Sequence, residues 1–168
     1  ETVVYLPTPE AVPGEQVAAM RALASDMDAG RVQLLMILGE SNPVLTAPAD
    51  LNFADALGKV PMRVHSGLYV DETAVLCHWH VPAAHYLEAW SDARTVDGTA
   101  SIVQPLIQPM YGGKSAHEMV ATLTATPDRN GYDLVREFWM AQPQGSSDPA
   151  TFEKAWRGWL HDGLIPGT

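Results

Sequence analysis

The chain has 168 residues, 46% of them hydrophobic, which is enough for one domain with a substantial core. Twenty Asp and Glu residues against ten Lys and Arg residues give a formal net charge of -10, so a phosphate backbone or an anionic membrane surface would repel the chain. The longest apolar run is far shorter than the roughly 20 residues that span a bilayer. We therefore predict a single domain over residues 1–168, with no nucleic acid partner and no direct insertion into a membrane.

The first part of the chain predicts two strands separated by a helix. A short apolar run at residues 3–6 is closed by Pro7, which predicts a brief first strand. Between residues 14 and 30 the apolar side chains recur every three or four positions, the spacing of an amphipathic helix that Gly30 ends. Residues 32–38 are almost continuously apolar, which is typical of a central strand buried on both faces of a parallel sheet.

The middle of the chain continues the alternation of helices and strands. Residues 50–57 predict a short helix with Asp50 as its N-cap, and residues 62–69 predict the next strand. Residues 76–81 and 101–107 predict two further strands. Strands that alternate with helices favour right-handed crossovers, so we expect a Rossmann-like α/β fold with a mostly parallel sheet flanked by helices.

The last part of the chain predicts three helices. Ser115 and Glu118 have the spacing of a capping box, which predicts a helix over residues 116–123. An apolar stripe follows after residue 131 and ends near Pro143. Asp148 before Pro149 predicts the start of a final helix, so we expect residues 143–168 to form a C-terminal docking helix that packs through its tryptophans.

The densest group of possible metal ligands is a histidine cluster around Cys77. In a strand, alternation places His78 and His80 on one face, and two imidazoles at that spacing could share a metal. A third ligand would have to come from His85, His65 or a distant carboxylate. Packed or hydrogen-bonded histidines are the more common outcome for such a pattern, so His78, His80 and His85 are weak metal candidates and no metal site is predicted.

Three other segments contain residue types that occur in active sites. The run Gly112-Gly113-Lys114-Ser115 resembles the end of a P-loop, but Gln108 stands where that motif requires glycine. Asp71 and Glu72 are adjacent carboxylates, which are more often found at a helix N-terminus than in catalysis. The residues that follow the apolar strand lie where open α/β sheets bind ligands, but they do not form a Gly-x-Gly-x-x-Gly fingerprint, so the pattern alone favours an ordinary strand-to-helix loop. These five candidate cofactor-binding residues are Gly39, Glu40, Ser41, Asn42 and Pro43.

Four phrases of the sequence resemble the molybdopterin oxidoreductase superfamily in their order and spacing. They are Leu-Met-Ile-Leu-Gly-Glu-Ser-Asn-Pro at residues 35–43, Asp-Glu-Thr-Ala at 71–74, Val-Pro-Ala-Ala-His-Tyr-Leu-Glu at 81–88 and Asp-Gly-Thr at 97–99. The phrases at residues 77–82 and 101–106 are most similar to the molybdopterin-like and iron-sulfur large subunit of bacterial alternative complex III. That assembly passes electrons from quinol to a periplasmic carrier.

The resemblance implies a nucleotide-binding-like domain of the formate dehydrogenase and DMSO reductase type. In catalytic members of the superfamily, the loop that matches residues 39–43 holds part of a molybdopterin guanine dinucleotide. The iron-sulfur cysteines and the metal-ligating residue of the superfamily belong to other domains. We therefore expect no cofactor in this chain itself, with the loop as a vestigial or real pterin and nucleotide cradle.

The leading hypothesis is a scaffold domain of a larger redox subunit in a respiratory electron-transfer complex. Its partners would be other domains of the same parent chain and other subunits of the complex, on the periplasmic side of the membrane as the resemblance implies. The parent would be an oxidoreductase, whereas the domain alone would have no complete active site. Three alternatives stay open: a domain of a true molybdopterin guanine dinucleotide enzyme, a small metal-dependent enzyme that uses His78 and His80, and an interaction module.

Overall fold

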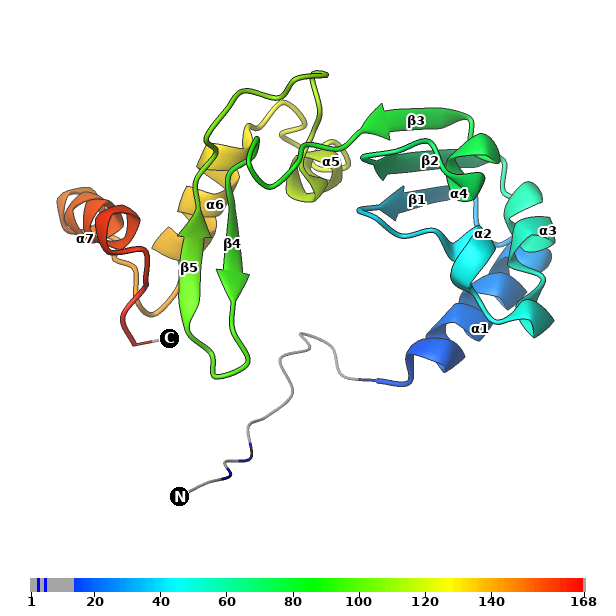
Figure 1. Cartoon of the computed structure of the whole chain (residues 1–168), viewed down its shortest axis with the longest axis horizontal. Helices are drawn as coiled ribbons and strands as arrows, with labels where there is room; N and C mark the ends of the chain where they lie inside the picture. Colours follow the sequence, from blue (N-terminus) through cyan, green and yellow to red (C-terminus); the bar gives the residue numbers. More distant parts are fainter. Residues whose placement is uncertain (1–2, 4, 6–13, 168) are drawn as a thin grey trace. The chain divides into compact units, whose positions relative to one another are not determined.

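The computed structural model describes Val3, Tyr5 and residues 14–167. Two of the four residues in the strand predicted at 3–6 lie outside this described part. The chain divides into two compact units. We call residues 14–84 with 111–116 the sheet unit and residues 85–110 with 117–167 the hairpin unit, and each is described by itself (Figure 1). The prediction of one domain over the whole chain stays a prediction.

The sheet unit is built on three parallel strands in the order β1-β2-β3. Their bounds are Leu34–Leu38, Met62–Gly67 and Trp79–Pro82. The register places Ile37 opposite His65, and His65 opposite His80. Parallel strands with helical crossovers confirm the predicted α/β, Rossmann-like class.

Five helical segments belong to this unit: one precedes β1 and four lie between the strands. They are α1 (Gln16–Asp28), α2 (Pro43–Thr46), the 3-10 turn η1 (Ala49–Leu51), α3 (Phe53–Gly58) and α4 (Glu72–Val75). Met27 of α1 and Leu57 of α3 are buried against Ile37 of β1, which forms the core of this unit. The helix predicted at residues 14–30 is therefore confirmed, and its apolar stripe covers one face of the sheet.

Strand β1 was predicted to be central and buried on both faces, and that prediction is wrong. Among the described strands β2 is the middle one and β1 lies at an edge. On the face away from the core, Leu34 is 44% exposed and Trp79 is 62% exposed. A continuous apolar run is typical of a strand that is covered on both faces, but the run does not identify the segment that covers each face.

The predicted helix at residues 50–57 is also corrected. Asn52, in a left-handed conformation with φ of 44°, separates η1 from α3. Asp50 lies within η1 and forms an ion pair with Arg21 at 2.9 Å, so it does not cap α3. The carboxylate has a cationic partner on α1, and α3 begins without a side-chain cap.

The hairpin unit contains two antiparallel strands, β4 (Ser91–Arg94) and β5 (Ala100–Val103). Strand β5 corresponds to the strand predicted at residues 101–107, but it does not join the parallel sheet. The preceding turn explains the difference, because Gly98, with φ of 94°, reverses the chain directly between β4 and β5. A short reversal of this kind produces an antiparallel pair.

Three helices complete the hairpin unit: α5 (Ala116–Ala121), which begins at the last residue of the sheet unit, α6 (Gly131–Met140) and α7 (Pro149–Asp162). Asp148 caps α7 by accepting a hydrogen bond from the Thr151 amide at 2.9 Å, as predicted. Trp156 and Trp159 of α7 are buried with Trp139 of α6. The tryptophans of the last helix therefore form the core of their own unit.

Candidate functional site

The candidate site lies where the parallel strands of the sheet unit end. Residues 39–43 follow β1 directly, and α2 begins at Pro43. Gly39 has a φ of +77°, a conformation that side chains rarely adopt, so glycine permits the turn out of the strand. The five predicted cofactor-binding residues thus form a single loop at the carboxyl edge of the sheet, the place where open α/β sheets bind ligands. We call this segment the 39–43 loop.

Hydrogen bonds hold the 39–43 loop against the start of α4. The Asn42 side-chain nitrogen donates to the Glu72 carboxylate at 2.7 Å, and the Thr73 hydroxyl donates to the side-chain oxygen Oδ1 of Asn42 at 2.8 Å. The Val44 amide in turn donates to the Thr73 hydroxyl at 3.1 Å. Asn42 is therefore engaged in bracing the loop. The Asn42 bond also lowers the pKa of Glu72, with a second contribution from a backbone hydrogen bond.

Asp71 and Glu72 lie at a helix N-terminus, as the sequence indicated. The Asp71 carboxylate accepts a hydrogen bond from the Ala74 amide at 2.8 Å and so caps α4. Its side chain is 22% exposed and lies beside the buried ring of His65, with 3.7 Å between Oδ1 and Nε2. The Asp71 carboxylate therefore caps α4 and also places a negative charge beside the His65 imidazole.

A pair of histidines lies beneath this loop. The Nδ1 atoms of His65 and His80 are 2.9 Å apart, and the two rings lie nearly parallel at an interplanar angle of 20°. His65 is only 1% exposed, whereas His80 is partly exposed. We call these two residues the imidazole pair.

Burial lowers the pKa of His65, because a charged ring would lose its hydration there. The Asp71 carboxylate opposes this decrease, the nearby His80 adds to it, and a backbone hydrogen bond with Ser41 also opposes it. The Nε2 atom of His65 has no hydrogen bond of normal geometry within the described residues. His65 is therefore a neutral ring enclosed by polar groups.

The predicted metal candidates do not come together as a ligand set. His78 accepts a hydrogen bond at Nδ1 from the Arg63 amide at 3.1 Å, while His80 faces His65. His85 belongs to the hairpin unit, where its Nδ1 accepts a hydrogen bond from the Leu87 amide at 3.3 Å. Within the described part of the chain, no group of three or more His, Cys, Asp or Glu side chains could hold a metal ion.

The other segments with possible chemistry have structural partners. Burial raises the pKa of the Cys77 thiol, which makes it a poor nucleophile. Lys114 pairs through its backbone with Pro82 and Ala84, beyond the end of β3. A Cβ atom on Gly113 would lie 2.8 Å from the carbonyl oxygen of Ala83, so this glycine permits close strand pairing. The Gly112 to Ser115 segment is therefore an extension of the sheet edge.

The charges of the site do not match a dinucleotide diphosphate. Glu40 in the 39–43 loop and Asp71 and Glu72 at α4 are carboxylates, and residues 39–43 and 68–75 contain no Lys or Arg. Lys114 lies beyond β3, about three strand spacings or roughly 14 Å from β1. An anionic diphosphate on this loop would meet carboxylates and no cation from these two segments. The side chains of these two segments therefore do not fit the charged part of a molybdopterin guanine dinucleotide.

Two features of the site were not predicted from the sequence. His65 had been considered only as a possible metal ligand, and its pairing with His80 follows from the parallel register of β2 and β3. The brace that Thr73 forms with Asn42 joins residues 31 positions apart, so local patterns could not reveal it. Gly67 gave a weak signal, since a glycine inside a strand pattern often marks a close approach.

A parallel sheet with helical connections and a braced loop at its carboxyl edge defines a Rossmann-like α/β unit. No family model matches the chain. In an alignment 129 positions long that covers 73% of this chain, it is 32% identical to the menaquinone reductase, molybdopterin-binding-like subunit of Nitratidesulfovibrio vulgaris. The chain spans 18% of the length of that relative.

The structure is similar in fold to acetylene hydratase from Pelobacter acetylenicus. The TM-score is 0.55 and the sequence identity is 19%, over 64% of this chain and 15% of that chain. The description of the first of these proteins confirms the resemblance to the molybdopterin oxidoreductase superfamily that was drawn from the sequence.

Proposed function

We propose that the chain is a cradle-like scaffold domain of a molybdopterin oxidoreductase-type subunit in a respiratory electron-transfer complex, without a complete active site of its own. The observation that carries the proposal is the 39–43 loop, which keeps the position of a ligand-binding loop but is fastened to α4 through Asn42 and Thr73. Its side chains are used for bracing and its charges are acidic. The loop thus retains the architecture of a cofactor cradle while serving as a rigid structural element.

The similarity to a molybdopterin-binding-like subunit supports this proposal, because that relative is also named for its likeness to a cofactor-binding protein. The partners would then be the other domains of a longer parent chain and neighbouring subunits of a quinone-linked complex. The periplasmic side of the membrane is proposed for the parent, following the alternative complex III resemblance. Among the described residues, no helix has the length and apolar character needed to cross a membrane.

The test is the cofactor content of the full-length parent protein. We expect purified parent protein to contain no stoichiometric molybdenum or tungsten by mass spectrometry, and no pterin fluorescence after oxidation. A molybdoenzyme of the same superfamily, purified and oxidised in parallel, is the positive control. Stoichiometric molybdenum together with pterin would overturn the scaffold proposal and favour a true molybdopterin guanine dinucleotide enzyme.

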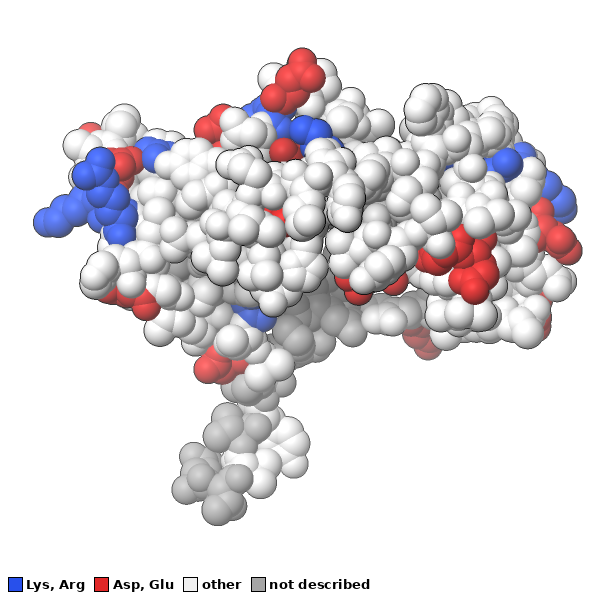
Figure 2. All heavy atoms as spheres, turned by 45° about the horizontal axis from the view of Figure 1, so that its top comes forward, with Lys and Arg blue, Asp and Glu red and all other residues white. Residues whose placement is uncertain are grey.

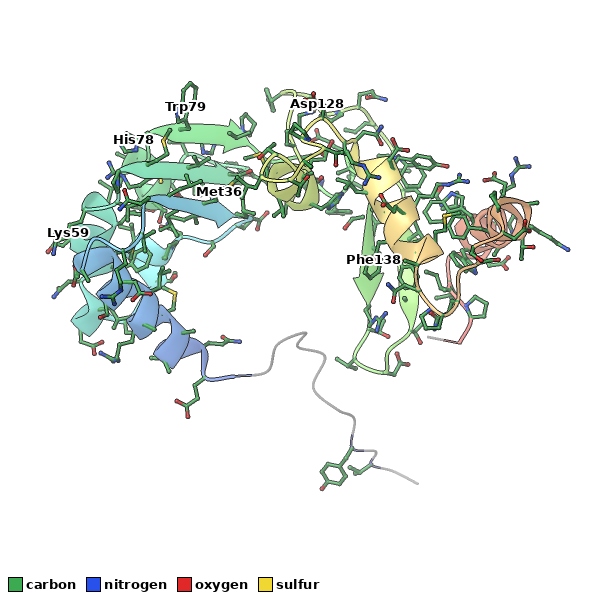
Figure 3. All side chains as sticks on the ribbon, turned by 180° about the vertical axis from the view of Figure 1, so that it is seen from behind. Met36, Lys59, His78, Trp79, Asp128 and Phe138 are labelled. Atoms are coloured by element: carbon green, nitrogen blue, oxygen red, sulfur yellow. The ribbon has the colours of Figure 1, made fainter. Side chains whose placement is uncertain are left out.

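An interaction role is the second candidate, and the exposed face of the sheet favours it. Leu34, Met62 and Trp79 are 44%, 42% and 62% exposed on the face that α1 and α3 do not cover. Figure 3 shows Trp79 pointing away from β3. Apolar side chains gathered on one face often mark a surface that another protein segment covers. If the rest of the parent chain covers this face, Trp79→Ser should destabilise the folded parent. The yield of soluble monomeric parent protein should then fall, and size-exclusion chromatography measures it.

A further inference from the structure

The imidazole pair has a geometry that fixes where its hydrogens lie. Two nitrogen atoms 2.9 Å apart can form a hydrogen bond only if one carries a hydrogen and the other accepts it. His65 Nε2 lies 3.7 Å from an Asp71 carboxylate oxygen. A lone pair on Nε2 would face that negative charge, so a neutral His65 carries its hydrogen on Nε2. His80 must then donate from its own Nδ1 to His65.

While the two Nδ1 atoms remain in contact, the pair can hold one additional proton but not two. With one additional proton on the pair, each ring has a hydrogen on Nε2, and the two Nδ1 atoms can share the hydrogen between them. The negatively charged Asp71 carboxylate stabilises this single positive charge. A second additional proton would place hydrogens on both Nδ1 atoms, which face each other at 2.9 Å. The rings would then have to separate.

The buried ring of His65 also lies against the 39–43 loop. A Cβ atom added to Gly67 would lie 2.7 Å from His65 Cε1 and 3.4 Å from the Gly39 carbonyl oxygen, so the ring and the start of the loop lie close to the same glycine. The Ser41 backbone forms a further hydrogen-bonding contact with His65. Asp71, which faces the ring, immediately precedes the residues that bind Asn42. Movement of His65 would therefore disturb the loop from beneath.

We propose that His65 and His80 are positioning residues for the 39–43 loop, holding it in place while they share one hydrogen and releasing it when a second additional proton separates their rings. The inference deepens the proposed function, since it rests on this loop being the cradle of the domain. It makes the position of the cradle sensitive to proton concentration, without any ligand being bound.

The groups around the pair determine the direction of the pH effect. Asp71 before α4 and His80 on β3 act on His65 through their charge, while β1 places the apolar Ile37 at the paired position and the loop presents the Ser41 backbone. Burial lowers the pKa of His65, so the folded state binds fewer protons than the unfolded state just below the ordinary histidine value of about 6.5. The stability that depends on a neutral His65 is fully present above about pH 6.5 and is lost as the pH falls below that value.

The experiment is a pH titration of the 168-residue chain by nuclear magnetic resonance with 15N labelling. At neutral pH we expect the His65 ring to carry its hydrogen on Nε2 and the His80 ring to carry one on Nδ1. As the pH falls, we expect the Ser41 and Asn42 amide signals to shift in one step on the acid side of about pH 6.5. The Leu57 amide in α3 should keep its position through that step.

Two variants at residue 80 separate positioning from general stability. In His80→Asn, the side-chain amide can donate to His65 from nearly the same place as Nδ1, but it does not titrate. We expect His80→Asn to keep the neutral-pH positions of the Ser41 and Asn42 signals and to move their acid step to higher pH, because the charge of His80 no longer opposes protonation of His65. His80→Ala should displace both signals already at neutral pH. His161→Asn, at an 88% exposed histidine of α7, is the matched control and should change none of these signals.

Three results would overturn the inference. The first is the opposite tautomer at His65, with its hydrogen on Nδ1 at neutral pH. The second is an acid step of the Ser41 and Asn42 signals that is identical in the original chain and in His80→Asn. The third is a simultaneous shift of Leu57, which would indicate unfolding of the whole unit. None of these measurements requires a bound cofactor, so the inference can fail or hold independently of the cofactor content of the parent protein.

Discussion

Individual glycines decide how closely the loop and the histidines approach each other. Gly67 is the last residue of β2, and a Cβ atom there would lie only 2.7 Å from the His65 ring. Real Cβ atoms do not approach other atoms this closely, and the ring is fully buried, so it has little room to move. The absence of a side chain at this position allows His65 to lie between the strand and the loop.

We expect Gly67→Ala to displace the His65 ring and to lower the free energy of unfolding by about 1–3 kcal/mol, the range for an overpacked buried site. Chemical denaturation, followed through the His65 ring signals, measures the change. Gly58→Ala is the matched control, because a Cβ atom at residue 58 would meet nothing within 4 Å. It should be neutral or slightly stabilising, since alanine favours the helix. Equal losses in the two variants would contradict the close approach at residue 67.

The sequence predicted the location of the site residues more accurately than it predicted their interaction partners. It placed Gly39 and Asn42 in a loop after a strand, and both lie there. It treated His78 and His80 as equivalent because alternation puts them on one face, yet each has a different partner. Strand register, which pairs His65 with His80, depends on two segments 15 residues apart and is not a local property.

The elements of the hairpin unit show how local signals and long-range packing combine. Asn130 before α6 accepts a hydrogen bond from the Asp133 amide at 2.9 Å and so caps that helix. Within the helix, Val135 and Trp139 are buried, whereas Phe138 is 49% exposed on the next face (Figure 3). The sequence predicted the apolar stripe, but only part of the stripe is buried in the core of the unit. A helix start is thus encoded locally, while the buried side of the helix is set by its neighbours.

We expect Asn130→Ala to lower the free energy of unfolding by about 1 kcal/mol, because the first turn of α6 would lose its cap. Tryptophan fluorescence in urea measures this change, since Trp139 lies in the same helix and is buried. Asn130→Ser is the conservative control and should retain most of the stability, as serine is also a strong N-cap. The cap would have no role if the alanine and serine variants denatured at the same urea concentration.

At the scale of the whole molecule, the acidic charge is the property with the clearest physical consequence. On the face drawn in Figure 2, the Lys and Arg side chains occur in small separate groups and form no continuous positive patch. Several cations of the sheet unit are paired with carboxylates, such as Lys59 with Asp28 at 2.9 Å. The net charge of -10 therefore acts mainly as a general repulsion within the folded chain.

We expect added sodium chloride to raise the thermal unfolding midpoint of the chain at neutral pH. Raising the ionic strength from about 0.01 M to about 0.1 M shortens the Debye length from about 30 Å to about 10 Å, which screens the repulsion between carboxylates. Calorimetry measures the midpoint. The effect should shrink as the pH approaches the isoelectric point of about 4.8, where the net charge vanishes. A midpoint that falls with salt would show that the exposed ion pairs outweigh the repulsion.

The sequence by itself determined the α/β class, the bounds of most helices and the loop that follows β1. These features depend on side-chain periodicity, capping residues and turn residues, which act over a few positions of the chain. Family kinship was also readable, since the phrases at residues 35–43 and 71–74 are specific in order and spacing.

Only the tertiary structure decided the neighbours. It placed β1 at the edge of the described sheet, paired β5 with β4, and buried Trp156 within its own unit. It also brought His65 to His80 and Thr73 to Asn42. The physical reason is that strand pairing and side-chain burial depend on contacts between distant segments, and the same apolar run or histidine can satisfy more than one such arrangement.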